Sequence, residues 1–240
     1  MKITSFAAAA ALLAAPLSAQ ALLGTEVGVR GSYWAPRLGG DLSVAGSESF
    51  DLQGDLEFDD GMDRGIPGAE VFAQLGDHHL SLAGYRADYE GTDDSSLKYD
   101  QFEATYQWDL IDLENWIAGT SFGPALQLKY LDGKAKLPLG VRESFQLAVP
   151  MIGVGAHVGI LADLVEARAR GLWIGYRGNS AVDAFGEVIY SPFPFVDVAV
   201  GYRYIKLKAD ASDMVGSSGD LALDATQQGP YVSLTVKIGL

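Results

Sequence analysis

Residues 230–240 read PYVSLTVKIGL, and every second one is apolar: Pro230, Val232, Leu234, Val236, Ile238 and Leu240. The residues between them are Tyr231, Ser233, Thr235, Lys237 and Gly239. Because successive side chains of a strand point to opposite faces, this stretch has one apolar and one mixed polar face. Strands of soluble domains usually run about five or six residues, whereas a tilted strand needs about 9–11 to cross a bilayer. The stretch therefore predicts a membrane-spanning strand, with its apolar face toward lipid and its polar face inside a closed barrel.

The other end of the chain carries a secretion signal. Met1-Lys2 supplies a positive start, residues 3–15 form an apolar block rich in Ala and Leu, and Ala19-Gln20-Ala21 is a small-x-small cleavage site. This order predicts a signal peptide over residues 1–21, which is cleaved, and a single mature domain over 22–240. The alternative interpretation of the same residues is a buried N-terminal helix.

Composition narrows the class of protein further. The chain has 240 residues, a formal charge of −14 and no Cys, so no disulfide holds it together. No internal run reaches the roughly 18 apolar residues of a membrane helix. The acidic balance argues against nucleic acid as a partner, since its phosphates would be repelled. Residues 37–66 are the most acidic stretch but lack the spacing of a Ca²⁺ loop, so we expect no metal and no cofactor.

Alternation of apolar and polar residues recurs along the chain. The pattern predicts ten strands, with eight as the alternative count, at residues 25–34, 67–75, 80–90, 97–110, 117–131, 145–160, 166–177, 182–190, 196–208 and the C-terminal stretch. Long or polar connections follow the odd-numbered strands and tight turns follow the even-numbered ones. This rhythm predicts an all-β, antiparallel up-and-down transmembrane barrel with both termini in the periplasm. Residues 37–66 then lie outside the cell and the turn at residues 76–79 lies in the periplasm.

The signal peptide, the strand rhythm and the segments GYRYIKLKAD (201–210) and GPYVSLTVKIGL (229–240) carry a family resemblance. Together they resemble small bacterial outer-membrane β-barrel proteins of the OmpA/OmpW-like size class. In that class the final strand is an assembly signal and usually ends in an aromatic residue, where this chain has Leu240. The resemblance implies location in the bacterial outer membrane. The partners we expect are outer-membrane lipids and lipopolysaccharide and the barrel assembly machinery, with the protein itself a monomer.

Charged residues on the polar faces are the candidate lining of the lumen. The set is Arg30, Glu70, Arg86, Glu103, Lys129, His157, Arg170, Glu187, Arg203 and Lys237. Charges desolvated in a narrow lumen cost several kcal/mol unless they pair. We therefore expect a ladder of salt bridges that largely fills a structural barrel or leaves room only for small solutes. The alternative is a narrow pore for small or hydrophobic molecules, as the OmpW resemblance implies.

Two other functions and one other fold are alternatives to this interpretation. His79-Leu80-Ser81 has the His-x-Ser spacing of outer-membrane lipid hydrolases, which place a base beside a nucleophile. The pattern is short, and the topology puts it at the periplasmic turn, whereas those enzymes act at the outer leaflet. We therefore expect no enzyme activity and no catalytic residues. An adhesin acting through its exterior loops is a further alternative, and a secreted soluble β-sandwich or soluble barrel is the alternative fold.

Overall fold

The structure is a computed structural model that describes residues 25–44, 49–53, 65–91, 95–112, 119–136, 142–160, 164–176, 178–209 and 221–239. The described part of the chain is built from strands, and it contains no helix that is long and apolar enough to cross a membrane. The strands are β1 (Thr25–Trp34), β2 (Arg37–Val44), β3 (Ser49–Asp51), β4 (Ile66–Leu75), β5 (His78–Glu90), β6 (Ser96–Trp108), β7 (Ile111–Asp112), β8 (Thr120–Lys136), β9 (Arg142–Gly159), β10 (Val165–Tyr176), β11 (Asn179–Phe193), β12 (Val196–Ala209) and β13 (Leu221–Gly239).

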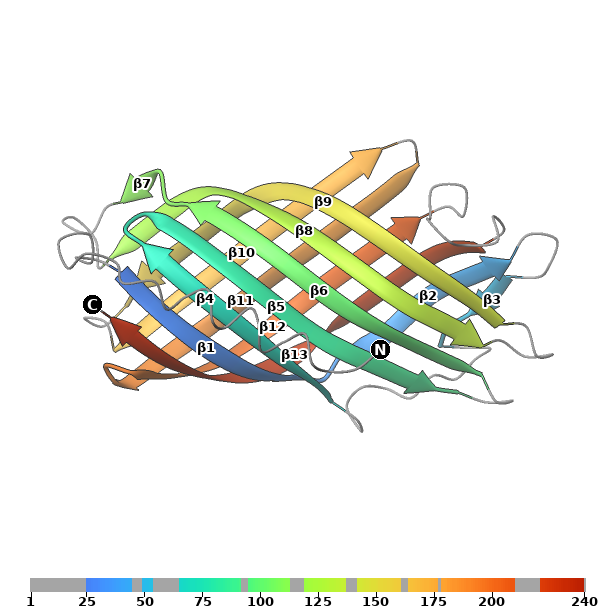
Figure 1. Cartoon of the computed structure of the whole chain (residues 1–240), viewed down its shortest axis with the longest axis horizontal. Helices are drawn as coiled ribbons and strands as arrows, with labels where there is room; N and C mark the ends of the chain where they lie inside the picture. Colours follow the sequence, from blue (N-terminus) through green and yellow to red (C-terminus); the bar gives the residue numbers. More distant parts are fainter. Residues whose placement is uncertain are drawn as a thin grey trace, which may run out of the picture.

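Ten of these strands close into a barrel (Figure 1). The order around the ring is β1-β4-β5-β6-β8-β9-β10-β11-β12-β13, every pair is antiparallel, and β13 returns to pair with β1. Three strands lie outside the ring: β2 continues the pairing of β13 beyond the end of β1, β3 pairs with β2, and the short β7 pairs with β8. The predicted ten-stranded antiparallel barrel is therefore confirmed, and the eight-strand alternative is wrong.

The side chains of the last strand, β13, point to the two sides that the alternation in its sequence predicts. Val232 and Ile238 expose 51% and 62% of their surface on the outside of the barrel, while Ser233 and Thr235 are buried inside. The same outward row on neighbouring strands is apolar. Its exposed members include Val29, Val71, Leu80, Leu82, Leu126, Leu128, Ile152, Val154, Val198 and Val200. A closed barrel with an apolar outer surface buries its backbone hydrogen bonds between strands, and this is how a sheet satisfies its polar groups in lipid.

The polarity of both faces inverts part-way along the strands, and β6 shows this most clearly. From its middle to its C-terminal end, Phe102 and Trp108 are exposed outside, while Glu103 and Thr105 are buried inside. Near its N-terminal end the buried side chains are Leu97 and Tyr99, and the charged Lys98 and Asp100 face out. Side chains of β6 continue to alternate between the inside and the outside along the whole strand. What changes is therefore the surroundings on each side of the sheet, and not the direction in which each side chain points.

The barrel thus has two halves that we name by their position relative to the C-terminus. The proximal half contains the chain end, is apolar outside and has a polar interior. The distal half, at the right in Figure 1, is charged outside and has an apolar interior. Its interior is formed by Leu38, Leu42, Leu52, Tyr89, Leu97, Tyr99, Leu131, Ala135, Phe145, Val149, Ile205, Leu207 and Leu223. The distal half therefore packs like a water-soluble barrel.

Exposed aromatic residues mark both edges of the apolar belt. Trp108 and Phe122 lie toward the proximal end, and Tyr130 and Tyr202 lie where the charged surface begins. On β8 the belt runs from Phe122 to Tyr130, about nine residues, which matches the length of a tilted membrane-spanning strand. Aromatic rings at these levels are typical of the two interfacial girdles of a membrane barrel.

The connections at the distal end differ from the prediction. β8 extends to Lys136 and β9 begins at Arg142, where a loop over 132–144 was expected. β13 begins at Leu221, nine residues before the predicted stretch 230–240. β10 ends at Tyr176 and β11 begins at Asn179, so the connection between them is shorter than the expected residues 178–181, and Gly178 has a φ of 92°. The acidic stretch 37–66 contributes β2 and β3. The strands are longer because their distal parts bury an apolar core of their own. The predicted signal peptide, residues 1–21, lies outside the described residues.

Candidate functional site: the charged interior of the proximal half

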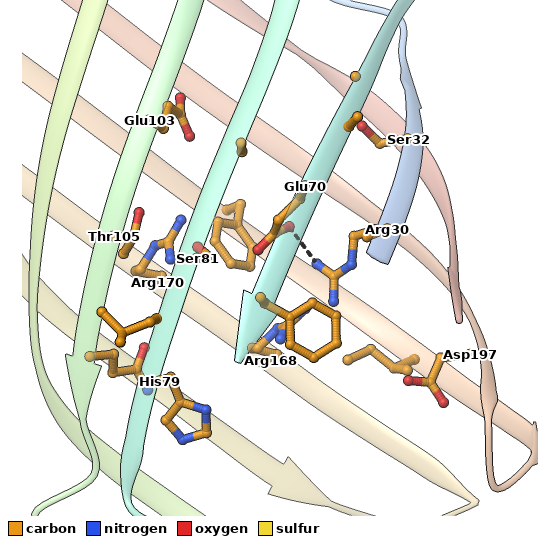
Figure 2. Close-up of a pocket in the computed structure, with 18 of the residues that line it drawn as sticks. Arg30, Ser32, Glu70, His79, Ser81, Glu103, Thr105, Arg168, Arg170 and Asp197 are labelled. Atoms are coloured by element: carbon orange, nitrogen blue, oxygen red, sulfur yellow. Dashed lines mark ion pairs between the residues drawn. The ribbon is translucent and has the colours of Figure 1, made fainter. Parts of the chain in front are cut away.

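A cavity of about 390 Å³ occupies the interior of the proximal half. Its lining begins at the proximal rim with Glu26, Glu166 and Lys237 and reaches Trp34 and Tyr85 at the boundary with the distal half. Figure 2 shows the side chains that point into it. The inward positions of β9 are partly glycine, which leaves room for long side chains. At Gly155, for example, a Cβ would lie 2.0 Å from the amide oxygen of Gln107.

The first charge cluster consists of Glu103, Lys129, Asp183 and Arg203. The Lys129 Nζ lies 3.0 Å from Glu103 and 2.7 Å from Asp183, and Arg203 pairs with the same two carboxylates. Gln101 and Gln127 donate further hydrogen bonds to Glu103. Since β6 and β12 stand five positions apart in the ten-strand ring, the Glu103–Arg203 pair crosses the full width of the barrel. Two acids and two bases make this cluster neutral.

The second cluster lies nearer the β1 wall. Arg30 approaches Glu70 at 3.6 Å and Glu187 at 3.5 Å, and Arg168 also pairs with Glu187. Figure 2 shows Arg30 and Glu70 facing one another across the cavity wall. The Tyr231 hydroxyl donates to Glu187 at 2.7 Å, and the Arg30 Nε donates to the Thr235 hydroxyl at 3.1 Å. This cluster is also neutral, with two arginines and two glutamates.

Arg170 stands apart from both clusters. Its guanidinium lies 4.9 Å from the centre of the Phe185 ring, in a cation–π contact. Among the residues that the structure describes, no carboxylate oxygen lies within ion-pair distance of it. The side chain lines the cavity and is partly accessible from it.

A hydrogen-bonded group at the proximal rim centres on Asp109. This carboxylate accepts from His79 Nε2 at 2.9 Å, from Gln107 at 2.7 Å and from the Ser121 hydroxyl at 2.7 Å. Ser121 also lies 2.8 Å from His157 Nδ1. Because the only proton of Ser121 goes to the carboxylate, His157 Nδ1–H must donate to the hydroxyl. The group ties β5, β6, β8 and β9 together, and its proton order leaves Ser121 without a base.

Lys237 closes the rim on the β13 side. Its Nζ lies 3.4 Å from Glu26 on β1 and 3.1 Å from Asp197 on β12. Asp197 also accepts a 2.7 Å hydrogen bond from Ser191. The described residues contain no group of three or more His, Asp or Glu side chains arranged to hold a metal ion.

Aromatic side chains separate this polar interior from the distal core. Trp34 packs edge-on against Tyr85 at 5.7 Å, and Tyr85 against Tyr99 at 6.3 Å. Trp34 donates from Nε1 to the Gly229 carbonyl at 3.1 Å, and Arg203 lies over the Trp34 ring. Beyond this layer Gln227 donates to the Tyr89 and Tyr99 hydroxyls, and burial raises the pKa of Tyr99 well above its ordinary value. An apolar cavity of about 50 Å³ lies in this distal core.

The structure places nine of the ten predicted lumen residues inside the proximal half. They are Arg30, Glu70, Glu103, Lys129, His157, Arg170, Glu187, Arg203 and Lys237. Arg86 is the exception, and its assignment to the lumen is wrong. Its side chain is 75% exposed on the outside of the distal half, where it shares the face of Leu80 and Leu82. It binds Asp100 on β6, and this hydrogen bond lowers the pKa of the Asp100 carboxyl.

Sequence reasoning missed several members of the interior. Asp183 and Arg168 complete the two clusters, and Asp109 and Ser121 complete the rim group. The signal for the first two was present: Asp183 shares the inward face of Glu187, and Arg168 that of Arg170. Asp109 was harder to find because it is 30 residues from His79 in the chain.

The His-x-Ser pattern does not form a base–nucleophile pair. His79 and Ser81 both face the barrel interior, and His79 bonds Asp109. Among the described residues no hydrogen bond joins His79 to Ser81. A hydrolase of membrane lipids needs its nucleophile at the lipid surface, so this arrangement gives the alternative of a lipid hydrolase no geometric support.

A closed barrel with an apolar belt, aromatic girdles and a charged interior is a membrane-spanning β-barrel of the bacterial outer-membrane class. No family model and no curated protein matches the chain. Among solved structures it is similar to the outer membrane protease OmpT from Escherichia coli, with a TM-score of 0.59 and 9% identity, covering 90% of this chain and 97% of that one. Neisserial surface protein A gives 0.40 and 12% identity over 90% and 97% of the two chains, and Ail of Yersinia pestis gives 0.36 and 9% over 90% and 100%. The first likeness supports the fold alone.

Proposed function

We propose that this protein is a closed, non-conducting structural barrel of the outer membrane. The observation that carries the proposal is the apolar core of the distal half, which lies directly beyond the cavity. A hydrated ion or polar solute crossing the barrel would have to pass between Leu38, Leu42, Leu131 and Phe145, all buried. Stripping a charge of water there costs several kcal/mol or more.

The charge clusters support the same proposal. Glu103–Arg203 and Lys129–Asp183 join strands on different sides of the barrel, so the lumen is crossed by side chains. A ten-stranded barrel is also narrow, since open aqueous channels belong to barrels of about 16–18 strands. The distal apolar cavity of about 50 Å³ is smaller than the roughly 150 Å³ that admits a benzene molecule. This disfavours a route for hydrophobic molecules through the barrel.

The proposal includes an orientation and a set of neighbours. With both termini in the periplasm, the distal half projects from the cell and its charged outer surface meets water and the head groups of lipopolysaccharide. Lipids cover the apolar belt, and the barrel assembly machinery would read β13 as the last strand. We propose a monomer without a cofactor, because β1 and β13 pair and close the lipid-facing half, which leaves no sheet edge there to pair with a second copy.

Single-channel recording in a planar bilayer tests the proposal. Protein refolded in detergent is first checked by the migration shift between boiled and unboiled samples on a gel, and a large trimeric porin serves as the positive control. We expect no steps of conductance from the folded protein. Regular conductance steps that scale with protein concentration would overturn the proposal.

A further inference from the structure

The charges of the inner barrel do not balance at one position. In its middle, four carboxylates (Glu70, Glu103, Asp183 and Glu187) are engaged by four cations (Arg30, Lys129, Arg168 and Arg203). Arg170 is a fifth cation, and within the described ranges no carboxylate pairs with it. An arginine stays protonated in proteins, so this positive charge cannot be removed by losing a proton.

The remaining charged groups of the lining lie toward the proximal rim and form no ion pair with Arg170. Asp109 accepts hydrogen bonds from His79, Gln107 and Ser121. Lys237 holds Glu26 and Asp197 at the rim. Glu166 shares the inward face of β10 with Arg170 but lies four residues away, about 13 Å along a strand. Burying a charge without a partner is unfavourable, so the guanidinium requires water or an anion on the side that faces the cavity.

The surroundings of Arg170 resemble a built site more than a gap in packing. Its guanidinium lies over the Phe185 ring, which occupies one face of the planar group and leaves the N–H groups at its edge free to bind. Figure 2 shows Arg170 and Thr105 pointing into the same space as Glu70 and Arg168. Phe72 and Phe185 also line the cavity and supply apolar surface. A volume of about 390 Å³ falls within the range of roughly 300–1,000 Å³ that is typical of small-molecule sites.

We propose that the cavity binds a small organic monoanion, with its carboxylate on Arg170 and its apolar body against the aromatic lining. A carboxylate fits the fork of a guanidinium with two parallel hydrogen bonds. One negative charge pairs with Arg170, whereas a second would face Glu70 and Glu103. The ligand enters at the proximal rim, because the distal core closes the other end. This site is independent of the non-conducting function, since a cavity open at one end can bind without letting a solute through.

Fluorine NMR titration of 4-fluorobenzoate against the protein in dodecyl maltoside tests the site. The neutral isostere 4-fluorobenzamide is the matched control ligand, and empty micelles correct for partitioning. We expect the wild-type protein to bind the benzoate at least tenfold more tightly than the amide. Equal affinities, or no saturable binding of the benzoate, would overturn the proposal.

Two variants then assign the binding to Arg170. We expect Arg170→Gln to weaken benzoate binding at least tenfold and to abolish the preference over the amide. The matched control Arg86→Gln removes a guanidinium from the outside of the distal half and should leave the affinity unchanged. Wild-type affinity in Arg170→Gln would overturn the proposal.

Folding of the variants provides a second readout. Because Arg170 has no carboxylate partner in the described structure, Arg170→Gln should unfold at the same denaturant concentration as the wild type or a higher one. Benzoate should raise the unfolding midpoint of the wild type and not that of the variant. A marked loss of stability in Arg170→Gln without ligand would show that the guanidinium has a structural partner, and would also overturn the proposal.

Discussion

Replacement of Lys129 by Met should destabilise the barrel far more than the same replacement of a surface lysine that also forms an ion pair with an aspartate. The Lys129 side chain is 4% exposed, and its Nζ lies 2.7 Å from Asp183 and 3.0 Å from Glu103. Without it, two buried carboxylates share the single charge of Arg203. Removing one partner of a buried ion pair typically costs about 3–5 kcal/mol, mostly from the uncompensated charge that stays behind. Methionine keeps most of the volume, so the loss is electrostatic.

Lys98 offers a matched control on the outside of the distal half. Its Nζ lies 2.8 Å from Asp88, almost the same distance as in the buried pair, but the two side chains are 50% and 49% exposed. Pairs exposed to this extent contribute about 0.2–1 kcal/mol. The free energies of unfolding would be measured by urea denaturation in lipid vesicles, followed by tryptophan fluorescence. Equal losses for Lys129→Met and Lys98→Met would refute the reasoning.

The double variant Lys129→Met/Asp183→Leu separates charge from packing. It leaves Glu103 and Arg203 as a neutral pair, and an ion pair replaced by apolar groups of similar volume is often close to neutral in stability. We expect it to recover most of the stability that Lys129→Met loses. A double variant that is as unstable as the single one, or less stable, would indicate that packing at Lys129 is what matters.

Three further predictions concern the two surfaces and the distal core. Phe145→Ala, which empties a buried position of the distal core, should cost about 3–5 kcal/mol of unfolding free energy and speed protease cleavage of the distal half in intact vesicles. Leu234→Arg puts a charge on the lipid-facing belt and should cost about 2–4 kcal/mol, whereas Ser144→Arg on the exposed outside of the distal half should change stability by less than about 0.5 kcal/mol; equal effects would contradict the position of the belt. Arg86→Gln should raise the pKa of Asp100 toward its ordinary value, because the hydrogen bond from Arg86 lowers it. The small stability from this pair is therefore present above the unfolded pKa of Asp100 and is lost as the pH falls through the folded one, which a carboxyl NMR titration checks.

The sequence was sufficient to predict the class of fold because alternation is a local property. In β13 and in the proximal part of β6, the polarity of each residue predicts whether its side chain faces lipid or the barrel interior. The number of such alternating segments along the chain gives the count of ten strands. The pattern predicts the wrong face for a residue where the surroundings of the strand change from lipid to water along its length. Arg86 was placed inside because it is charged, yet it lies on the same face as Leu80, and only its height above the lipid belt explains its charge.

The ion-pair partners were beyond sequence reasoning for a different physical reason. Glu103 and Arg203 are 100 residues apart and meet only because the ring places β6 opposite β12. Which carboxylate serves which cation depends on strand register and on small residues such as Gly155, neither of which a periodic pattern specifies. The residues of the interior could therefore be predicted as a set, and their pairing could not.

The central claim is that one continuous barrel crosses from lipid into water part-way along its strands. The chain has no native Cys, so single cysteines at positions 98, 100, 102, 104 and 106 on the outer face of β6 can carry spin labels in lipid vesicles. Power saturation would compare the accessibility of each label to oxygen, which concentrates in lipid, and to a water-soluble nickel chelate. We predict that labels at 102, 104 and 106 favour oxygen and that those at 98 and 100 favour nickel. The same environment at all five positions would contradict the account.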